Sequence, residues 1–150
     1  MAMILASQSP RRRELLGQMG FSFTVRPARG EELPHPELTP AQLVEELARQ
    51  KALEVSDDVV VAADTVVAVD GTVLGKPRDR AHAAEMLSAL SGREHTVYTG
   101  VAVKRGEKLL VEHEATLVRF RPLTQREIHL YIQTGEPMDK AGGYGIQGYG

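Results

Sequence analysis

The strongest constraint on the fold is a continuous apolar run, Val59-Val60-Val61-Ala62-Ala63, followed directly by Asp64 and Thr65. Such runs are typical of central strands covered on both faces, so this one predicts an α/β sheet. Ligands in open α/β sheets bind beyond the carboxyl ends of the strands. Because apolar sequence resumes at Val66–Val69, Asp64 interrupts a strand where no turn residue is needed. Asp64 is therefore a candidate site residue, with a turn-forming aspartate as the alternative.

A hairpin is expected directly after this strand. Asp70-Gly71 is a tight-turn signal, and Thr72–Leu74 returns toward Gly75-Lys76-Pro77. With a two-residue turn, residues whose numbers sum to about 141 face one another, which places Asp64 and Lys76 within a residue of direct opposition. The two charges could serve a site or form a structural ion pair.

A short polar loop follows the apolar residues Ile4–Ala6 and leads into a predicted helix. Ser9 is a favourable N-cap and Pro10 suits the first helical position, while Gly20 is expected to end the helix after Met19. The residues expected to form its apolar face are Leu15, Leu16 and Met19.

Arg11, Arg12 and Arg13 occupy the first turn of this helix. The positive end of the helix dipole disfavours cations there, by roughly 0.3–1 kcal/mol each. A helix N-terminus offers free N–H groups to a phosphate, and guanidinium groups add charge-assisted hydrogen bonds. The turn is interpreted as a phosphate-binding site, with a solvated basic helix end as the alternative.

A second helix is predicted from the capping box that Thr39 and Gln42 form around Pro40, and it should end near Val55. Its expected buried stripe consists of Val44, Leu47, Ala48, Lys51 and Val55. A lysine among apolar positions either lays its stem along the edge of the core or reaches into a site.

The later elements follow from periodicity and capping residues. They are a strand over Phe21–Val25, a helix over Arg80–Ser91, a hairpin of His95–Val103 and Leu109–Arg121, and a helix from Thr124 to Gly135. His82, His95, His113 and His129 show no pair at metal-ligand spacing and are predicted to be structural or solvent-facing.

The stretch from Gly135 to Gly150 is dense in glycine and carries Asp139, Lys140 and Gln147. Such backbone is suited to close approach. It formally contains a G-x-G-x-x-G pattern, but a turn precedes it where the dinucleotide fingerprint requires a strand, so that function is rejected.

The chain of 150 residues is 42% hydrophobic and 25% charged, which predicts one compact domain, possibly two-lobed. It contains no cysteine, which excludes disulfides, zinc–thiolate sites and thiol nucleophiles and is compatible with a reducing cytoplasm. A net charge of −2 argues against a nucleic-acid partner. No apolar run approaches the roughly 20 residues of a membrane span, and no signal peptide is recognised.

The charged candidates fall into two sets. The cationic and hydroxyl residues are Ser7, Arg11, Arg12, Lys51, Lys76 and Lys140, and the acidic residues are Glu31 or Glu32, Asp64 and Asp139. This combination predicts a polyphosphate site, where carboxylates suit a hard divalent ion such as Mg²⁺. It favours phosphoanhydride hydrolysis, with a carboxylate that orients or deprotonates water.

Several motifs together resemble the Maf family of nucleotide pyrophosphatases. They are Ser7-x-Ser9-Pro10-Arg11-Arg12, Leu47-Ala48-x-x-Lys51-Ala52, Ala63-Asp64-Thr65, Gly75-Lys76-Pro77, Leu90-Ser91-Gly92, Gly135-Glu136-Pro137-x-Asp139-Lys140-Ala141-Gly142 and Gly145-Ile146-Gln147-Gly148. The resemblance implies a two-lobed α/β fold with a mixed sheet flanked by helices and a central cleft, shared with the inosine triphosphate pyrophosphatases. It also implies hydrolysis of a nucleoside triphosphate to the monophosphate and pyrophosphate with Mg²⁺ or Mn²⁺, a house-cleaning activity.

Carried over by position, Asp64 matches the family's catalytic acid, and Lys76 is the second catalytic candidate. Glu32 and Asp64 are the expected metal ligands. The expected substrate-binding residues are Ser7, Arg11, Arg12, Lys51, Thr65, Lys140 and Gln147. Within this set Arg11, Thr65 and Gln147 resemble substrate-selecting positions. They are similar to those of the dTTP/UTP branch rather than to the branch acting on 7-methyl-GTP.

Other functions within this resemblance are a pyrophosphatase for modified nucleotides, or a nucleotide-binding regulator of cell division and septum formation without turnover. The family usually continues past the glycine-rich segment, so residues 1–150 are expected to form one Maf-like domain without the family's C-terminal segment. A cytoplasmic homodimer is expected.

Overall fold

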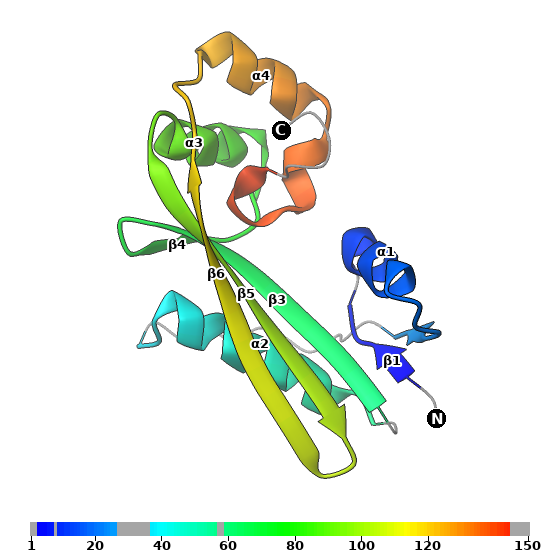
Figure 1. Ribbon diagram of the computed structural model, residues 1–150. Coiled ribbons are helices and arrows are strands. Elements are labelled where there is room, and N and C mark those ends of the chain that lie inside the picture. Colours follow the sequence, from blue (N-terminus) through cyan, green and yellow to red (C-terminus); the bar gives the residue numbers. More distant parts are fainter. Residues whose placement is uncertain (1–2, 8, 27–36, 57–58, 145–150) are drawn as a thin grey trace. The chain divides into compact units, whose positions relative to one another are not determined.

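The computed structural model describes residues 3–7, 9–26, 37–56 and 59–144 of the chain (Figure 1). Within these ranges lie six strands, four α-helices and two short 3-10 helices. The elements are β1 (Met3–Leu5), α1 (Pro10–Gln18), β2 (Thr24–Val25), α2 (Pro40–Glu54), β3 (Val59–Val69), β4 (Thr72–Leu74), α3 (Arg80–Leu90), β5 (Glu94–Arg105), β6 (Lys108–Arg119), α4 (Gln125–Gln133), η1 (Glu136–Asp139) and η2 (Ala141–Gly143).

The strands form one mixed sheet in the order β2-β1-β3-β5-β6, with β4 also paired to β3. β1 runs parallel to β2 and β3, with Ile4 opposite Val60, whereas β4 is antiparallel to β3, with Ala68 opposite Val73. The prediction of an α/β fold with a mixed sheet is confirmed. None of the helices in the described ranges is long and apolar enough to cross a membrane.

The chain divides into two compact units. The first unit comprises Met1–Asp64 and Thr99–Glu114, and the second comprises Thr65–Tyr98 and Ala115–Gly150. The strands β3, β5 and β6 contribute residues to both units.

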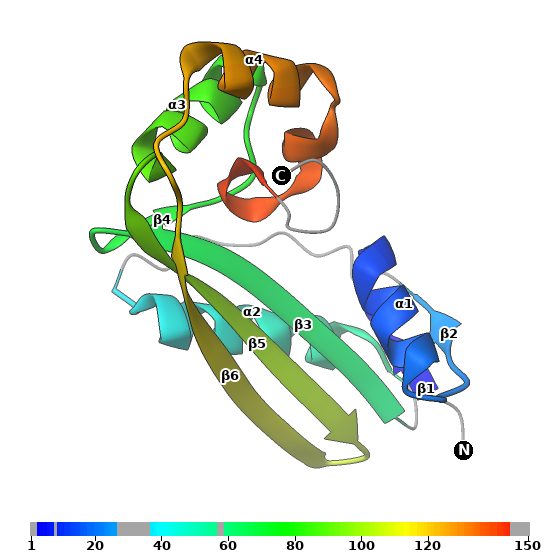
Figure 2. The same ribbon diagram turned by 45° about the horizontal axis from the view of Figure 1, so that its top comes forward.

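In the first unit α2 covers one face of the sheet (Figure 2). Thr39 and Gln42 form the predicted capping box. The core cluster consists of Ile4, Ala6, Ala48, Ala52, Val55, Val60, Ala62 and Ala102. Gly100 on β5 allows the helix to approach closely, because a Cβ there would lie 2.2 Å from the carbonyl oxygen of Val44.

The helix α1 begins where the sequence predicts, with the Ser9 side chain accepting a hydrogen bond from the Arg12 backbone N–H at 3.3 Å. The apolar residues expected on one face of this helix are largely exposed, since Leu15 is 42% and Met19 69% exposed. The strand predicted over Phe21–Val25 is shorter in the structure, where β2 spans only Thr24–Val25. Among the described strands β2 pairs with β1 alone, which offers only Met3–Leu5 as a partner.

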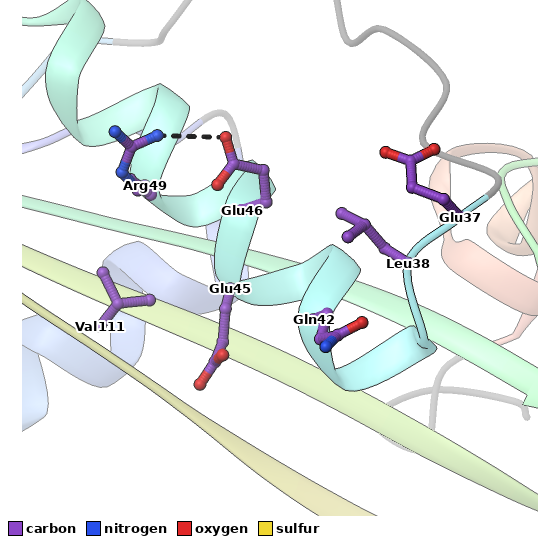
Figure 3. Close-up of a pocket in the computed structure, with 7 residues that line it drawn as sticks. All are labelled: Glu37, Leu38, Gln42, Glu45, Glu46, Arg49 and Val111. Atoms are coloured by element: carbon purple, nitrogen blue, oxygen red, sulfur yellow. Dashed lines mark hydrogen bonds and ion pairs between the residues drawn. The ribbon is translucent and has the colours of Figure 1, made fainter.

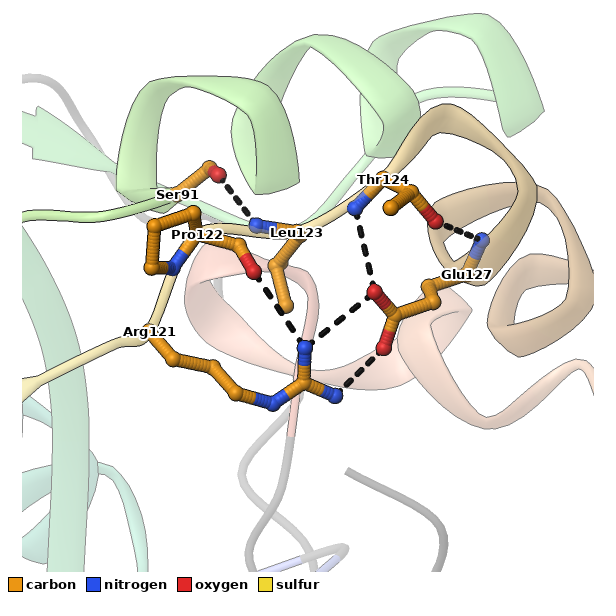
Figure 4. A network of polar contacts seen from close by, with 6 residues as sticks. All are labelled: Ser91, Arg121, Pro122, Leu123, Thr124 and Glu127. Atoms are coloured by element: carbon orange, nitrogen blue, oxygen red, sulfur yellow. Dashed lines mark hydrogen bonds and ion pairs between the residues drawn. The ribbon is translucent and has the colours of Figure 1, made fainter.

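In the second unit α3 and α4 lie side by side (Figures 1 and 2). Their shared core cluster consists of Val67, Val69, Ala83, Leu87, Leu90, Ile128, Ile132 and Tyr144. The capping box of α4 pairs Thr124 with Glu127, whose carboxylate also binds the Arg121 guanidinium (Figure 4). The Ser91 Oγ at the end of α3 accepts a hydrogen bond from the Leu123 N–H at 2.7 Å, which ties the two helices together.

Candidate functional site

Asp64 lies inside β3, which continues through Val66–Val69 as predicted, and not in a turn. β3 is an unbroken strand of 11 residues, so the polar residue changes the side-chain pattern without interrupting the backbone. Its pairing changes along its length, since it is parallel to β1 through Val61 and antiparallel to β4 from Val67. Asp64 falls between these two paired stretches in the sequence. The carboxylate is therefore carried by strand backbone.

Lys51 forms an ion pair with this carboxylate, its Nζ lying 3.1 Å from Asp64 Oδ2. The side chains are 24% and 13% exposed, respectively. Lys51 occupies the apolar stripe of α2 as predicted and reaches toward a charged partner instead of only following the core edge. The pair compensates for the desolvation of a half-buried carboxylate.

The predicted hairpin register is confirmed, with Val67 opposite Leu74, but the expected partner of Asp64 is not. The β4 strand ends at Leu74, and the carbonyl oxygen of the next residue, Gly75, accepts a hydrogen bond from the Gly142 N–H at 3.0 Å. Lys76 is exposed, and no ion pair of its side chain is found within the described ranges. The lysine paired with Asp64 is Lys51.

The loop before α1 contains a polar cluster around Ser7, which is only 6% exposed. Its Oγ accepts hydrogen bonds from the Ser9 N–H at 3.1 Å and from Arg12 Nη1 at 3.4 Å. The same Nη1 donates to the Ala63 carbonyl oxygen at 3.0 Å, which fixes Arg12 against the residue that precedes Asp64. This carbonyl was not predicted, because a main-chain acceptor leaves no signature in the sequence.

The three arginines of α1 have different environments. Arg12 is half-buried, whereas Arg11 and Arg13 are exposed. Arg11 Nη1 pairs with Glu14 Oε2 at 3.3 Å across one helical turn. The environment of Arg12 thus differs from that of its neighbours, while a substrate-selecting role of Arg11 stays a prediction.

The glycine-rich segment is close-packed at Gly142, which has a φ of 73°. A Cβ on this residue would lie 2.7 Å from Val67 Cγ2, so the close approach that the glycines predict is made to β3. Lys140 is half-buried, and its Nζ donates to the Glu136 carbonyl oxygen at 2.9 Å.

Several predicted site residues lie outside the described residues, namely Glu31, Glu32 and Gln147. Thr65 is half-buried on β3, and strand alternation places it on the opposite face from Asp64. Within the described ranges there is no group of three or more acidic or histidine residues that could hold a metal. Asp64 supplies a hard carboxylate donor, which suits Mg²⁺, an ion commonly held by one or two carboxylates together with substrate phosphates.

Two surface cavities are lined by residues other than the predicted site residues. One of about 480 Å³ borders α2 and is lined by Glu37, Leu38, Gln42, Glu45, Glu46, Arg49 and Val111 (Figure 3). The other, of about 300 Å³, is lined by Arg80, Ala81, Ala84, Gln125, Ile128, His129, Ile132 and Gln133 of α3 and α4. Neither contains a predicted site residue, so the candidate site rests on the polar contacts around Asp64 and Ser7.

The mixed α/β fold carries an acid, a lysine, an arginine and a hydroxyl group beside one strand, which defines an α/β protein with a candidate site for a charged ligand. The solved structure of the Staphylococcus aureus Ham1 protein shares the fold, with a TM-score of 0.57 at 14% identity over 79% of this chain and 71% of that chain. The family described as Maf-like protein matches residues 2–150, and the chain belongs to this family.

Curated relatives carry the name dTTP/UTP pyrophosphatase. The protein from Symbiobacterium thermophilum is 57% identical over 97% of this chain and 77% of its own length. Those from Moorella thermoacetica and Bacillus pumilus are 54% and 51% identical over 99% of this chain, and 79% and 80% of their own lengths.

Proposed function

We propose that this chain hydrolyses nucleoside triphosphates to the monophosphate and pyrophosphate, with dTTP and UTP as preferred substrates. The family match and the relatives named dTTP/UTP pyrophosphatase support this enzymatic function. The observation that carries it is the ion pair of Asp64 with Lys51, formed one residue beyond the carbonyl that binds Arg12.

Asp64 is proposed to accept the proton of the attacking water. The water oxygen bonds to the α-phosphorus, the bond from that phosphorus to the α–β bridging oxygen breaks, and pyrophosphate leaves. Lys51 holds the carboxylate in place, and β3 supplies the strand backbone that carries it. Positioning and electrostatic stabilisation provide most of the catalysis in such reactions.

Phosphate oxygens are proposed to be bound by Ser7, Arg12, Lys76 and Lys140. The Arg12 guanidinium is anchored through Nη1 to Ser7 and Ala63, which sets its orientation before a substrate arrives. A guanidinium can donate hydrogen bonds from several N–H groups in a fixed plane, and the first turn of α1 adds a favourable dipole. Lys76 is proposed as the second catalytic residue.

Asp64 and Glu32 are proposed to hold a divalent ion, Mg²⁺ or Mn²⁺. When bound, such an ion neutralises developing charge on the phosphate oxygens. Base selection is assigned to Arg11, Thr65 and Gln147, since an amide such as that of Gln147 can both donate to and accept from a pyrimidine edge.

We also propose that residues 1–150 form one Maf-like domain and that the protein is a cytoplasmic homodimer. The match of the family to residues 2–150 supports the first part. Light scattering of the purified chain tests the second, because a monomeric mass at micromolar concentration contradicts a homodimer.

The function is tested by measuring pyrophosphate release from a panel of canonical and modified nucleoside triphosphates with Mg²⁺ or Mn²⁺. We expect dTTP and UTP to be the best substrates, and Asp64→Asn to lower kcat about 10²–10⁴-fold, the range typical for loss of a general base. The matched control is Asp70→Asn, which makes the same change in the exposed turn that follows β3.

Unchanged turnover in Asp64→Asn contradicts the proposed mechanism. Faster hydrolysis of modified pyrimidine nucleotides shifts the substrate class instead. Tight nucleotide binding by the wild-type chain without any release of pyrophosphate favours the regulatory alternative over an enzyme.

A further inference from the structure

Three aromatic rings pack against one another at Tyr144, which lies within the glycine-rich segment. His95 comes from β5, Phe120 directly follows β6, and Tyr144 directly follows η2. The ring centroid of Phe120 lies 5.0 Å from the ring centroid of His95 and 4.7 Å from that of Tyr144. Both pairs of rings are in an edge-to-face arrangement. The backbone hydrogen bond from the Phe120 N–H to the Arg93 carbonyl oxygen, at 3.0 Å, holds the two strands together beside the rings.

His95 and Tyr144 also share a hydrogen bond, with His95 Nε2 and the Tyr144 Oη 2.5 Å apart. His95 is 2% and Tyr144 9% exposed. The other ring nitrogen of His95, Nδ1, is buried and has no hydrogen-bond partner among the described residues. Burial lowers the pKa of His95, which favours a neutral imidazole paired with Tyr144.

The backbone that leads to Tyr144 is held at a second place, besides the His95–Tyr144 hydrogen bond. The Gly142 N–H donates to the Gly75 carbonyl oxygen, and Gly142 packs against Val67 without room for a Cβ. Lys140 lies just before this contact and Lys76 just after Gly75. The Gly143 N–H closes the turn by donating to the Lys140 carbonyl oxygen at 3.0 Å. The aromatic rings and the packing at Gly142 together determine the course of the chain from Lys140 to Tyr144.

We propose that His95 and Tyr144 are positioning residues that hold Lys140 in place for binding the triphosphate, a role that rests on the proposed function of Lys140. Neither residue touches the substrate in this proposal. Tyr144 anchors the backbone of the segment, and His95 anchors the Tyr144 hydroxyl. Releasing the hydroxyl leaves the fold intact and lets Lys140 move, so substrate binding weakens before turnover does.

The test is the separation of KM from kcat in Tyr144→Phe, which removes one hydroxyl from a buried ring. We expect KM for dTTP to rise about fivefold to tenfold, the size expected for one buried hydrogen bond, with kcat within about twofold of wild type. Tyr98→Phe is the matched control, since the Tyr98 hydroxyl on β5 makes no hydrogen bond among the described residues. A merely structural role lowers kcat through loss of folded enzyme and leaves KM unchanged, which overturns the proposal.

Two further comparisons show whether the pair acts through Lys140. His95→Gln keeps a side-chain amide that can bind the Tyr144 hydroxyl and is expected to stay near the wild-type KM, whereas His95→Leu should resemble Tyr144→Phe. In a Lys140→Ala background Tyr144→Phe should add little. Additive effects of the two changes, or a His95→Leu variant with wild-type KM, overturn the proposal.

A readout without turnover separates this proposal from the proposed function. Amide hydrogen exchange of the peptide spanning Glu136–Tyr144 should be faster in Tyr144→Phe than in wild type, and unchanged in Tyr98→Phe. If the wild-type chain releases no pyrophosphate, the proposed function fails while the exchange result still decides whether the pair positions the segment. Equal exchange in the two variants contradicts such positioning.

Discussion

Two regions of the molecule are stabilised in different ways. Around Asp64 the contacts are hydrogen bonds and ion pairs of polar side chains, whereas around Gly142 they are backbone hydrogen bonds and close packing. Lys51 pairs with Asp64, and Arg12 bridges Ser7 and the Ala63 carbonyl oxygen. At the second region, the Gly142 N–H binds the Gly75 carbonyl, and the Gly142 backbone leaves no space before Val67.

The two regions should therefore respond to different kinds of substitution. Hydrogen bonds to charged groups depend on donor geometry, so the Asp64 region should be sensitive to changes of side-chain chemistry at constant charge. Backbone held by packing depends on volume and on φ, so the Gly142 region should be sensitive to added methyl groups.

The largest effect on stability is expected for Gly142→Ala. The new Cβ meets Val67, and an L-residue at a φ of 73° is strained. Overpacking and the left-handed backbone together should lower the free energy of unfolding by about 3 kcal/mol. Gly71→Ala is the control, because Gly71 has a similar φ of 77° with nothing within 4 Å of a Cβ, and should cost only about 1 kcal/mol. Equal losses in urea denaturation would contradict a packing role for Gly142.

The next effect is expected for Arg12→Lys, which keeps the charge and removes the planar group that joins Ser7 to Ala63. A lysine ammonium cannot reproduce this arrangement while also binding a phosphate, so kcat/KM should fall about 10–100-fold. Arg13→Lys makes the same substitution one residue later on an exposed side chain and should stay within about twofold. Similar kinetics for both variants would show that the first turn of α1 contributes only charge.

A smaller effect is expected from Tyr144 on the free energy of unfolding at alkaline pH. Burial, with a contribution from Tyr131, raises the pKa of Tyr144 to about 12 from its ordinary value of 10.0. Because the folded pKa is raised, the contribution of Tyr144 is complete below pH 10 and is lost as the pH rises through about 12. Urea denaturation of wild type and Tyr144→Phe between about pH 9 and 12 should show a steeper loss in wild type, and parallel curves would contradict this.

The smallest effect is expected at acid pH from the exposed Arg121–Glu127 pair of Figure 4. Hydrogen bonding from Arg121, together with the backbone N–H of Thr124, lowers the pKa of Glu127 from 4.5 to about 2. Its contribution is present above pH 4.5 and is lost as the pH falls through about 2. Glu127→Gln should flatten this part of the thermal stability profile, with the apolar region around Gly142 unaffected.

Local sequence predicted the helices well because their signals lie within one turn. The Thr39 and Thr124 capping boxes, the N-cap at Ser9 and the turn at Asp70-Gly71 all form as expected. Each depends on contacts between residues at most a few positions apart, which propensity and capping rules describe directly.

The predictions that differ from the structure share a different cause. The exposure of Leu15 depends on what packs against α1, and the partner of Asp64 depends on where α2 lies. Hydropathy predicts that a face can be buried and that a charge needs a partner, but it does not say which segment supplies either.

By itself the sequence determined the class of fold, the family motifs and the set of candidate charges. Tertiary structure decided which groups meet. Lys51 pairs with Asp64 across 13 positions, His95 with Tyr144 across 49, and Arg12 with the Ala63 carbonyl across 51. Contacts at such separations depend on how strands pair and helices pack, and no local pattern specifies the partner.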